Sequence, residues 1–178
     1  VINLNTTFSE DEKKSIWSFV KDGGSLLILG DHTNIDIMTS LNDLLKSRGI
    51  SYRFDSALSL DSINGWLTCY NKMKNPINFG IYNNEIEIGV GASLDISPPA
   101  FPVIIGDFAF SDYGDIKNAK KAFLGDYKYN KGEKLGDVVL VAGCYYNKGR
   151  VLVFGDTTTF QNPSLPVSHR FVSRVFSW

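Results

Sequence analysis

Two stretches of the chain share one pattern, in which four apolar residues are followed by Gly-Asp and small polar residues. They are residues 26–29 (Leu-Leu-Ile-Leu) and residues 151–154 (Val-Leu-Val-Phe). Continuous apolar runs of this length predict buried strands of a parallel sheet, and the polar residues after them predict loops. In open α/β folds such loops meet at the carboxyl edge of the sheet, where ligands bind. The pattern therefore predicts where a site lies without identifying its chemistry.

Helical periodicity separates the predicted strands. Ser9 and Glu12 form the pattern of a capping box, which predicts a helix before the first strand. A second helix is expected after Thr33 or Asn34, with an apolar stripe formed by Ile37 or Met38, Leu41, Leu44 and Leu45. A strand at residues 50–54 would complete a second β-α-β unit. Two such units in a row predict an α/β domain with a mostly parallel sheet.

The middle of the chain is less regular. Residues 85–90 alternate between polar and apolar, which predicts a half-exposed strand, and residues 101–105 predict a short strand after Pro98-Pro99. Residues 106–134 are rich in aromatic residues, glycine and lysine. They fit either a lid over the sheet edge or a packed surface loop with a short helix near residues 118–123.

The last part of the chain predicts a hairpin and a helix. The strands are expected at residues 137–146 and 150–154, and the Asn147-Lys148-Gly149 turn between them makes the pair antiparallel. A helix beginning near Pro166 would pack on the sheet through an apolar stripe formed by Val167, Phe171, Val172, Val175 and Phe176.

Composition narrows the class of protein. A chain of 178 residues is most simply one domain, residues 1–178, and it begins inside a strand without an initiator Met, so we expect it to be a piece of a longer protein. A net charge of −1 argues against a nucleic-acid partner, which needs clustered Lys and Arg. Apolar runs of strand length predict no membrane span. Cys69 and Cys144 leave the redox compartment open.

The candidate site lies in the loops after the two matching strands. If those strands are neighbours, Asp31 and Asp156 stand close together and bind a small polar ligand or a shared cation. The residues expected to add hydrogen bonds or ligand contacts are His32, Thr33, Asn34, Thr157, Thr158 and Asn162. The alternative is that each aspartate caps a helix or ties down its own loop.

Catalysis is the second hypothesis for the same loops. Asp31, His32 and Asp156 would hold a divalent cation and lower the pKa of its bound water, as in a metal-assisted hydrolase. No other cofactor is expected. His169 would then face His32, or it would be an unrelated surface imidazole.

Other chemistry has less support from the sequence. Phosphate-binding glycine motifs are absent, and the three threonines at residues 157–159 have no base at a diagnostic spacing. The aromatic residues Trp66, Tyr70, Tyr113 and Tyr127 fit either a binding surface or half-buried packing.

Several motifs carry a resemblance to a known family. They are Phe8-Ser9 with Glu12 and Phe19-Val20, the run at residues 23–32, and the run at residues 149–156 followed by Asn162. This order of motifs resembles the class I glutamine amidotransferase-like domains, in the non-catalytic branch found in gliding-motility, intraflagellar-transport and transporter-associated proteins. The resemblance implies a flavodoxin-like three-layer sandwich.

The chain departs from the catalytic members of that family. Their nucleophilic Cys stands on a glycine-flanked elbow between a strand and a helix, whereas Cys69 lacks such glycines and Cys144 falls inside the predicted hairpin. We therefore expect a non-catalytic module that binds a small polar ligand, a protein partner or a neighbouring domain of the same polypeptide.

Overall fold

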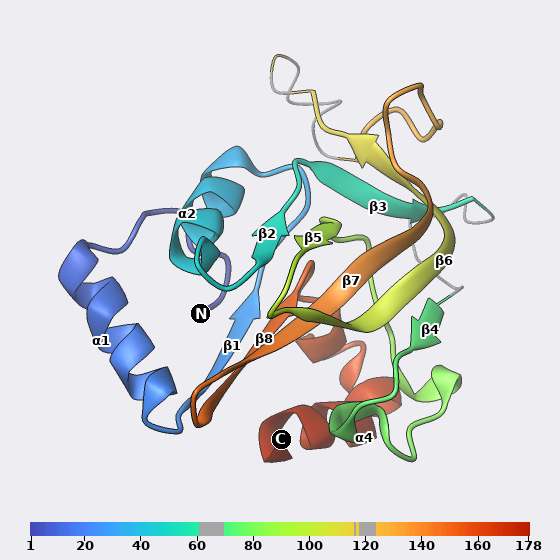
Figure 1. Ribbon diagram of the computed structural model, residues 1–178. Helices are drawn as coiled ribbons and strands as arrows, with labels where there is room; N and C mark the ends of the chain where they lie inside the picture. Colours follow the sequence, from blue (N-terminus) through green and yellow to red (C-terminus); the bar gives the residue numbers. More distant parts are fainter. Residues whose placement is uncertain (61–69, 116, 118–123) are drawn as a thin grey trace.

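The computed structural model describes residues 1–60, 70–115, 117 and 124–178 (Figure 1). Trp66, Cys69 and residues 118–123, where a short helix was predicted, lie outside the described residues. The described chain forms the α-helices α1 (Glu10–Lys21), α2 (Ile35–Leu45) and α4 (Leu165–Ser177). The strands are β1 (Ser25–Leu29), β2 (Ile50–Tyr52), β3 (Asp55–Ser59), β4 (Tyr70–Lys72), β5 (Leu94–Ile96), β6 (Phe101–Tyr113), β7 (Leu135–Tyr146) and β8 (Gly149–Phe154). Short 3-10 helices are η1 (Pro76–Asn78), η2 (Asn83–Glu85) and η3 (Thr158–Phe160).

The predicted helix starts are confirmed. Ser9 and Glu12 form a reciprocal capping box at α1, with the Glu12 N–H donating to Ser9 Oγ over 3.3 Å. Asn34 caps α2 by accepting from the Ile37 N–H over 3.2 Å. Each cap satisfies backbone donors that have no partner inside the helix. Lys13 then links the two helices, since its Nζ lies 2.7 Å from Asp43 Oδ2.

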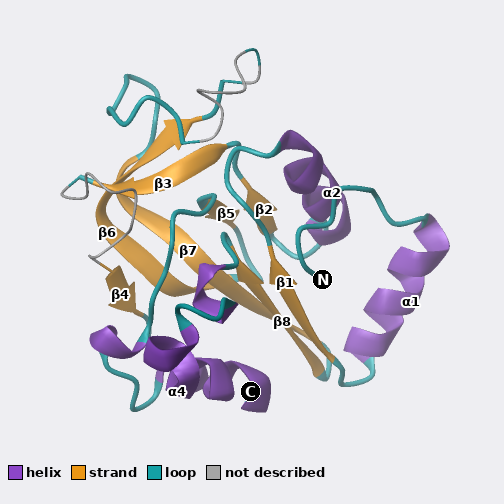
Figure 2. Cartoon of the chain, turned by 180° about the vertical axis from the view of Figure 1, so that it is seen from behind, coloured by secondary structure: helices purple, strands orange, loops and turns teal. Residues whose placement is uncertain are grey.

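The flavodoxin-like, mostly parallel sheet is wrong. The eight strands form one mixed sheet that curls into a half-barrel, and among the described strand pairs only β1 and β8 run parallel (Figures 1 and 2). β2 does not extend a parallel sheet from β1, because it pairs antiparallel with β5. β7 and β8 form the predicted hairpin, whose Asn147-Lys148 turn is too short for the crossover that a parallel pair needs.

The curl comes from the long strand β6. Its pairing with β7 shifts register between Pro102 and Ile104, between Ile104 and Ile105, and between Gly106 and Ala109. Such bulges bend a strand and increase its twist. β6 can therefore pair with β7 along one edge and with β4 and then β3 along the other. The strand predicted at residues 101–105 is thus the beginning of a longer one, whose second half belongs to the segment of residues 106–134 that was predicted to form a lid or a packed loop.

The strand predicted at residues 85–90 is also wrong. The alternation is real, because Ile86 and Ile88 are buried, but the segment is irregular after η2. Its backbone bonds to side chains instead of a neighbouring strand. The Glu87 N–H donates to Ser168 Oγ of α4 over 2.8 Å, and Glu87 O accepts from Thr159 Oγ1 over 2.8 Å.

Two apolar cores lie on opposite faces of the sheet. Side chains of β8 alternate between them, since Val151 and Val153 pack with α2 and β1 whereas Leu152 and Phe154 pack with β6, β7 and α4. Phe154 meets the ring of Phe171 from α4 at a centroid distance of 6.1 Å. A helix with the length and apolar character needed to traverse a bilayer does not occur among the described residues.

The edge of the sheet at β2 is covered by a side chain. Asn42 of α2 donates from Nδ2 to Tyr52 O over 2.9 Å and accepts from the Tyr52 N–H over 2.7 Å. Its amide therefore satisfies both backbone groups of Tyr52, in the way that a neighbouring strand would.

We expect the two phenylalanines of α4 to differ in their effect on stability. Phe171 is fully buried, so Phe171→Ala should lower the free energy of unfolding by about 3–5 kcal/mol. Phe176 is 73% exposed although its position was predicted to be apolar and packed, so Phe176→Ala should cost less than about 1 kcal/mol. Urea unfolding of both variants measures the difference. Equal losses would contradict the assigned packing of α4.

Candidate functional site

The loops after β1 and β8 lie side by side. The two strands are parallel neighbours with Leu29 opposite Phe154, so Asp31 and Asp156 follow their strands at equivalent positions. The Gly30 N–H donates to Phe154 O over 3.1 Å and continues the pairing beyond the strands. The predicted adjacency of these loops is therefore what the structure shows.

Glycine is required between each strand and its aspartate. A Cβ at Gly30 would meet the Tyr52 ring at 2.3 Å, and a Cβ at Gly155 would meet Ala92 O at 2.1 Å. The Tyr52 hydroxyl passes over Gly30 to donate to Phe154 O over 2.8 Å. Burial raises the pKa of Tyr52 well above its usual value, so this hydroxyl stays a donor.

Asp156 is half-buried and holds its own loop. Its Oδ2 accepts from the Thr158 N–H over 2.7 Å, and Gly89 and Gly91 leave room for it. Burial raises the pKa of Asp156, and the charge of Asp31 adds to the rise while bonds from Thr158 oppose it. A carboxyl group with a raised pKa beside a second carboxylate is a feature of functional sites as well as of structural loops.

The loop after β1 also uses its side chains locally. Asp31 Oδ1 accepts from the His32 N–H over 2.8 Å, and the Asp31 side chain is 37% exposed. His32 is nearly buried, with Nδ1 lying 3.2 Å from Thr33 Oγ1 and 3.3 Å from Ser56 Oγ. Thr33 adopts φ 44° and Asn34 caps α2.

The remaining predicted residues differ in exposure. Thr158 is buried, and Thr157 Oγ1 accepts from Gln161 Nε2 over 3.0 Å. Asn162 is exposed in the turn before α4. His169 is exposed, with its Nδ1 lying 3.2 Å from Pro166 O. His32 instead lies against Thr33 and Ser56, so the two histidines have different surroundings.

The chemistry available at this edge follows from these contacts. Among the described residues, no group of three or more His, Cys, Asp or Glu side chains is arranged to hold a metal ion. Cys144 lies fully buried within β7, and burial raises the pKa of its thiol. A nucleophilic cysteine needs the opposite, an exposed thiol with a lowered pKa. At the carboxyl edge of the sheet, the partly exposed Asp31 side chain can contact a polar group, while most of the other side chains there form hydrogen bonds within their own loops.

An ionic network around the buried Asp55 was not predicted from the sequence. Asp55 is fully buried, accepts from the Ser93 N–H over 2.7 Å and lies 3.0 Å from Arg53 Nε. Burial raises the pKa of Asp55, and the bonds from Ser93 and Arg53 oppose the rise. Arg53 also contacts Asp95, which pairs with Lys134. The Arg53-Phe54-Asp55 spacing, which puts opposite charges on one side of an extended chain, is the signal that could have found it.

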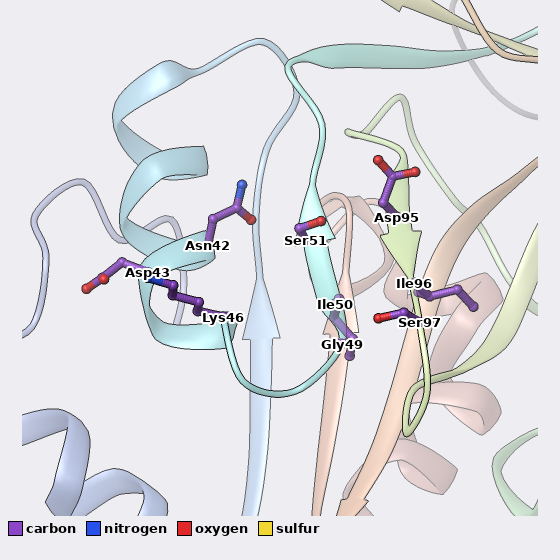
Figure 3. A pocket seen from close by; sticks show the side chains of 9 residues that line it. All are labelled: Asn42, Asp43, Lys46, Gly49, Ile50, Ser51, Asp95, Ile96 and Ser97. Atoms are coloured by element: carbon purple, nitrogen blue, oxygen red, sulfur yellow. The ribbon is translucent and has the colours of Figure 1, made fainter.

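A polar hollow of about 520 Å³ lies between α2 and the strands β2 and β5 (Figure 3). Figure 3 shows Asn42 turned toward β2, with Asp95 on the other side of the hollow. Both acidic residues of this hollow are already paired, Asp43 with Lys13 and Asp95 with Arg53. These two carboxylates therefore help to hold neighbouring helices and strands together.

Two larger hollows flank the segment of residues 72–76 between β4 and η1. One has a volume of about 750 Å³ and is also lined by Phe79 and Arg174, and the other has a volume of about 740 Å³ and is also lined by Phe101, Pro102 and Tyr145. We call this region the β4–η1 surface. β4, η1 and α4 lie together in Figures 1 and 2, at the lower part of the molecule.

Solved structures match the fold of this chain. The mmIFT52 N-terminal domain has a TM-score of 0.70 and 15% identity, covering 99% of this chain and 75% of that chain. The cytoplasmic protein STM1381 from Salmonella typhimurium LT2 has a TM-score of 0.52 and 13% identity, covering 96% of this chain and 66% of that chain. No protein-family model and no curated protein matches.

The comparisons support one part of the predicted family resemblance and do not support the other. The likeness to a domain of an intraflagellar-transport (IFT) protein agrees with the intraflagellar-transport part of it. The glutamine amidotransferase-like part has no support, because no family model matches and the mixed, curled sheet is not flavodoxin-like. Identities of 13–15% establish a shared fold and no shared activity.

We expect Asp156→Asn to change how stability depends on pH. The raised pKa of Asp156 means that the unfolded chain ionises first as the pH rises, which stabilises the unfolded state. Wild type should therefore lose stability relative to Asp156→Asn as the pH rises from about 4 toward 7, because asparagine keeps the acceptor for Thr158 without the charge. Urea unfolding of both proteins across this range measures the effect. A constant difference, or one that favours wild type at the higher pH, would contradict it.

Proposed function

We propose that this domain is a non-catalytic module that binds a protein partner, either a separate protein or a neighbouring domain of the same polypeptide. The observation that carries the proposal is the β4–η1 surface, where exposed apolar side chains lie at two hollows that are both lined by residues 72–76. Phe79 is 77% exposed, Met73 is 36% exposed and Tyr145 is 52% exposed. Clustered exposed apolar residues are typical of protein interaction sites.

The fold likeness is consistent with this role. A domain of an IFT protein shares the architecture, although at 15% identity it supports no particular partner. The buried Cys144 and the locally used side chains of the carboxyl edge favour binding over catalysis. Asp31, Asn34 and Asn162 remain a second contact region for a small polar ligand, which the raised pKa of the neighbouring Asp156 favours.

Site-specific crosslinking tests the proposed partner. A photoreactive phenylalanine analogue replaces Phe79 or Met73 in the full-length protein in its own cells, and Phe19 of α1 serves as the control because it is 60% exposed outside the surface. We expect crosslinked protein products at positions 79 and 73 and fewer at position 19. Absent products at 79 and 73, or equal products at all three positions, would contradict binding through this surface.

Assays of the purified domain test the non-catalytic assignment. We expect no turnover of glutamine, ester or glycoside substrates, and we expect a melting temperature that does not change with chelator or added divalent cations. A stabilisation by a divalent cation that disappears in both Asp31→Asn and Asp156→Asn would favour the metal-assisted hydrolase instead, because binding to the folded state raises its stability.

A further inference from the structure

The β4–η1 surface carries charge of one sign. Lys72, Lys74 and Arg174 line its hollows, and no described acidic residue lines either of them. Burial lowers the pKa of Lys72, and the charge of the nearby Glu85 opposes this lowering in part, but Glu85 is itself paired with Arg170. The cations of the surface are therefore not balanced by this neighbour, in a chain whose net charge is −1.

We propose that the β4–η1 surface docks an acidic segment of a partner protein, and that this segment inserts apolar side chains into the two hollows. The inference rests on the proposed function and adds the chemistry of the partner. Carboxylates of the segment pair with the three cations. Complementary charge of this kind speeds association and sets the orientation of the partner.

The hollows provide places for apolar anchors. Residues 72–76 line both hollows, so one anchor would lie on each side of this segment. Pro76 and Phe79 supply apolar walls on one side, and Phe101 and Pro102 supply them on the other. Anchors that fill pockets of this kind contribute most of the binding energy at protein interfaces.

The surface is held in place before a partner arrives. Asn78 donates from Nδ2 to Met73 O over 2.9 Å and to Val103 O of β6 over 2.8 Å. The Met73 N–H donates to Val103 O over 3.0 Å, and Asn75 accepts from the Asn78 N–H over 3.1 Å. A preformed surface loses less conformational entropy on binding.

Other anionic partners fit the surface less well. Anionic membranes are recognised by clusters of about four to eight basic residues, whereas Lys72, Lys74 and Arg174 are the described basic residues that line these hollows. Nucleic acid binding likewise needs more extensive neutralisation of phosphates. The concave, partly apolar shape favours a protein segment.

Selection from a random dodecapeptide library displayed on phage tests the proposal. We expect the enriched peptides to combine Asp or Glu with apolar residues, and to bind at least tenfold more weakly to Lys74→Glu and to Phe79→Ala. Lys148→Glu and Phe19→Ala are matched controls on exposed residues outside the surface, and both should bind as wild type does. Binding should also weaken as salt rises, because salt screens the charges. Circular dichroism checks that each variant is folded.

The other outcomes overturn the proposal in distinguishable ways. Enriched peptides that are basic or uncharged, or that bind Lys74→Glu and Phe79→Ala unchanged, remove the acidic partner while crosslinks at positions 79 and 73 keep the proposed function. A selection without enrichment also removes it. Vesicles containing phosphatidylserine and a single-stranded oligonucleotide are tested alongside, and tighter binding to either one than to the selected peptides would assign the surface to that class.

Discussion

The architecture depends on the position of β8 between β1 and β7. Its parallel pairing with β1 and its antiparallel pairing with β7 join these strands in one sheet, and its alternating side chains divide the interior into two cores. α1 and α2 pack against one core, and α4 packs against the other. The same pairing brings the loops that contain Asp31 and Asp156 to one edge, so the candidate site is a consequence of how β8 is paired.

Local features of this architecture were predictable from short-range chemistry. The capping box of Ser9 and Glu12, the cap at Asn34 and the turn at Asn147 depend on residues a few positions apart, and all are present. The overall sheet was not predictable in this way. Apolar runs indicate burial but not the direction of the neighbouring strand, and the bulges in β6 that curl the sheet have no equivalent in the hydrophobic pattern.

The candidate sites likewise have features that were predictable from the sequence and features that were not. The sequence placed Asp31 and Asp156 at one edge, but it could not show that Asp156 holds the Thr158 N–H or that His32 lies against Ser56. It did not indicate the β4–η1 surface at all. Residues 75–76 have the pattern of a turn, and the exposure of Phe79 depends on how η1 sits on β6 and α4, which is set by contacts distant in sequence.

The side-chain amide of Asn42 also affects whether another molecule can pair with the edge strand β2. An uncovered strand at the end of a sheet is a template on which another chain can add, and this is a common route to aggregation. Because Asn42 occupies both backbone groups of Tyr52, an incoming strand would have to break two hydrogen bonds and displace α2 before pairing there. A single side chain thus keeps this end of the sheet from templating uncontrolled growth.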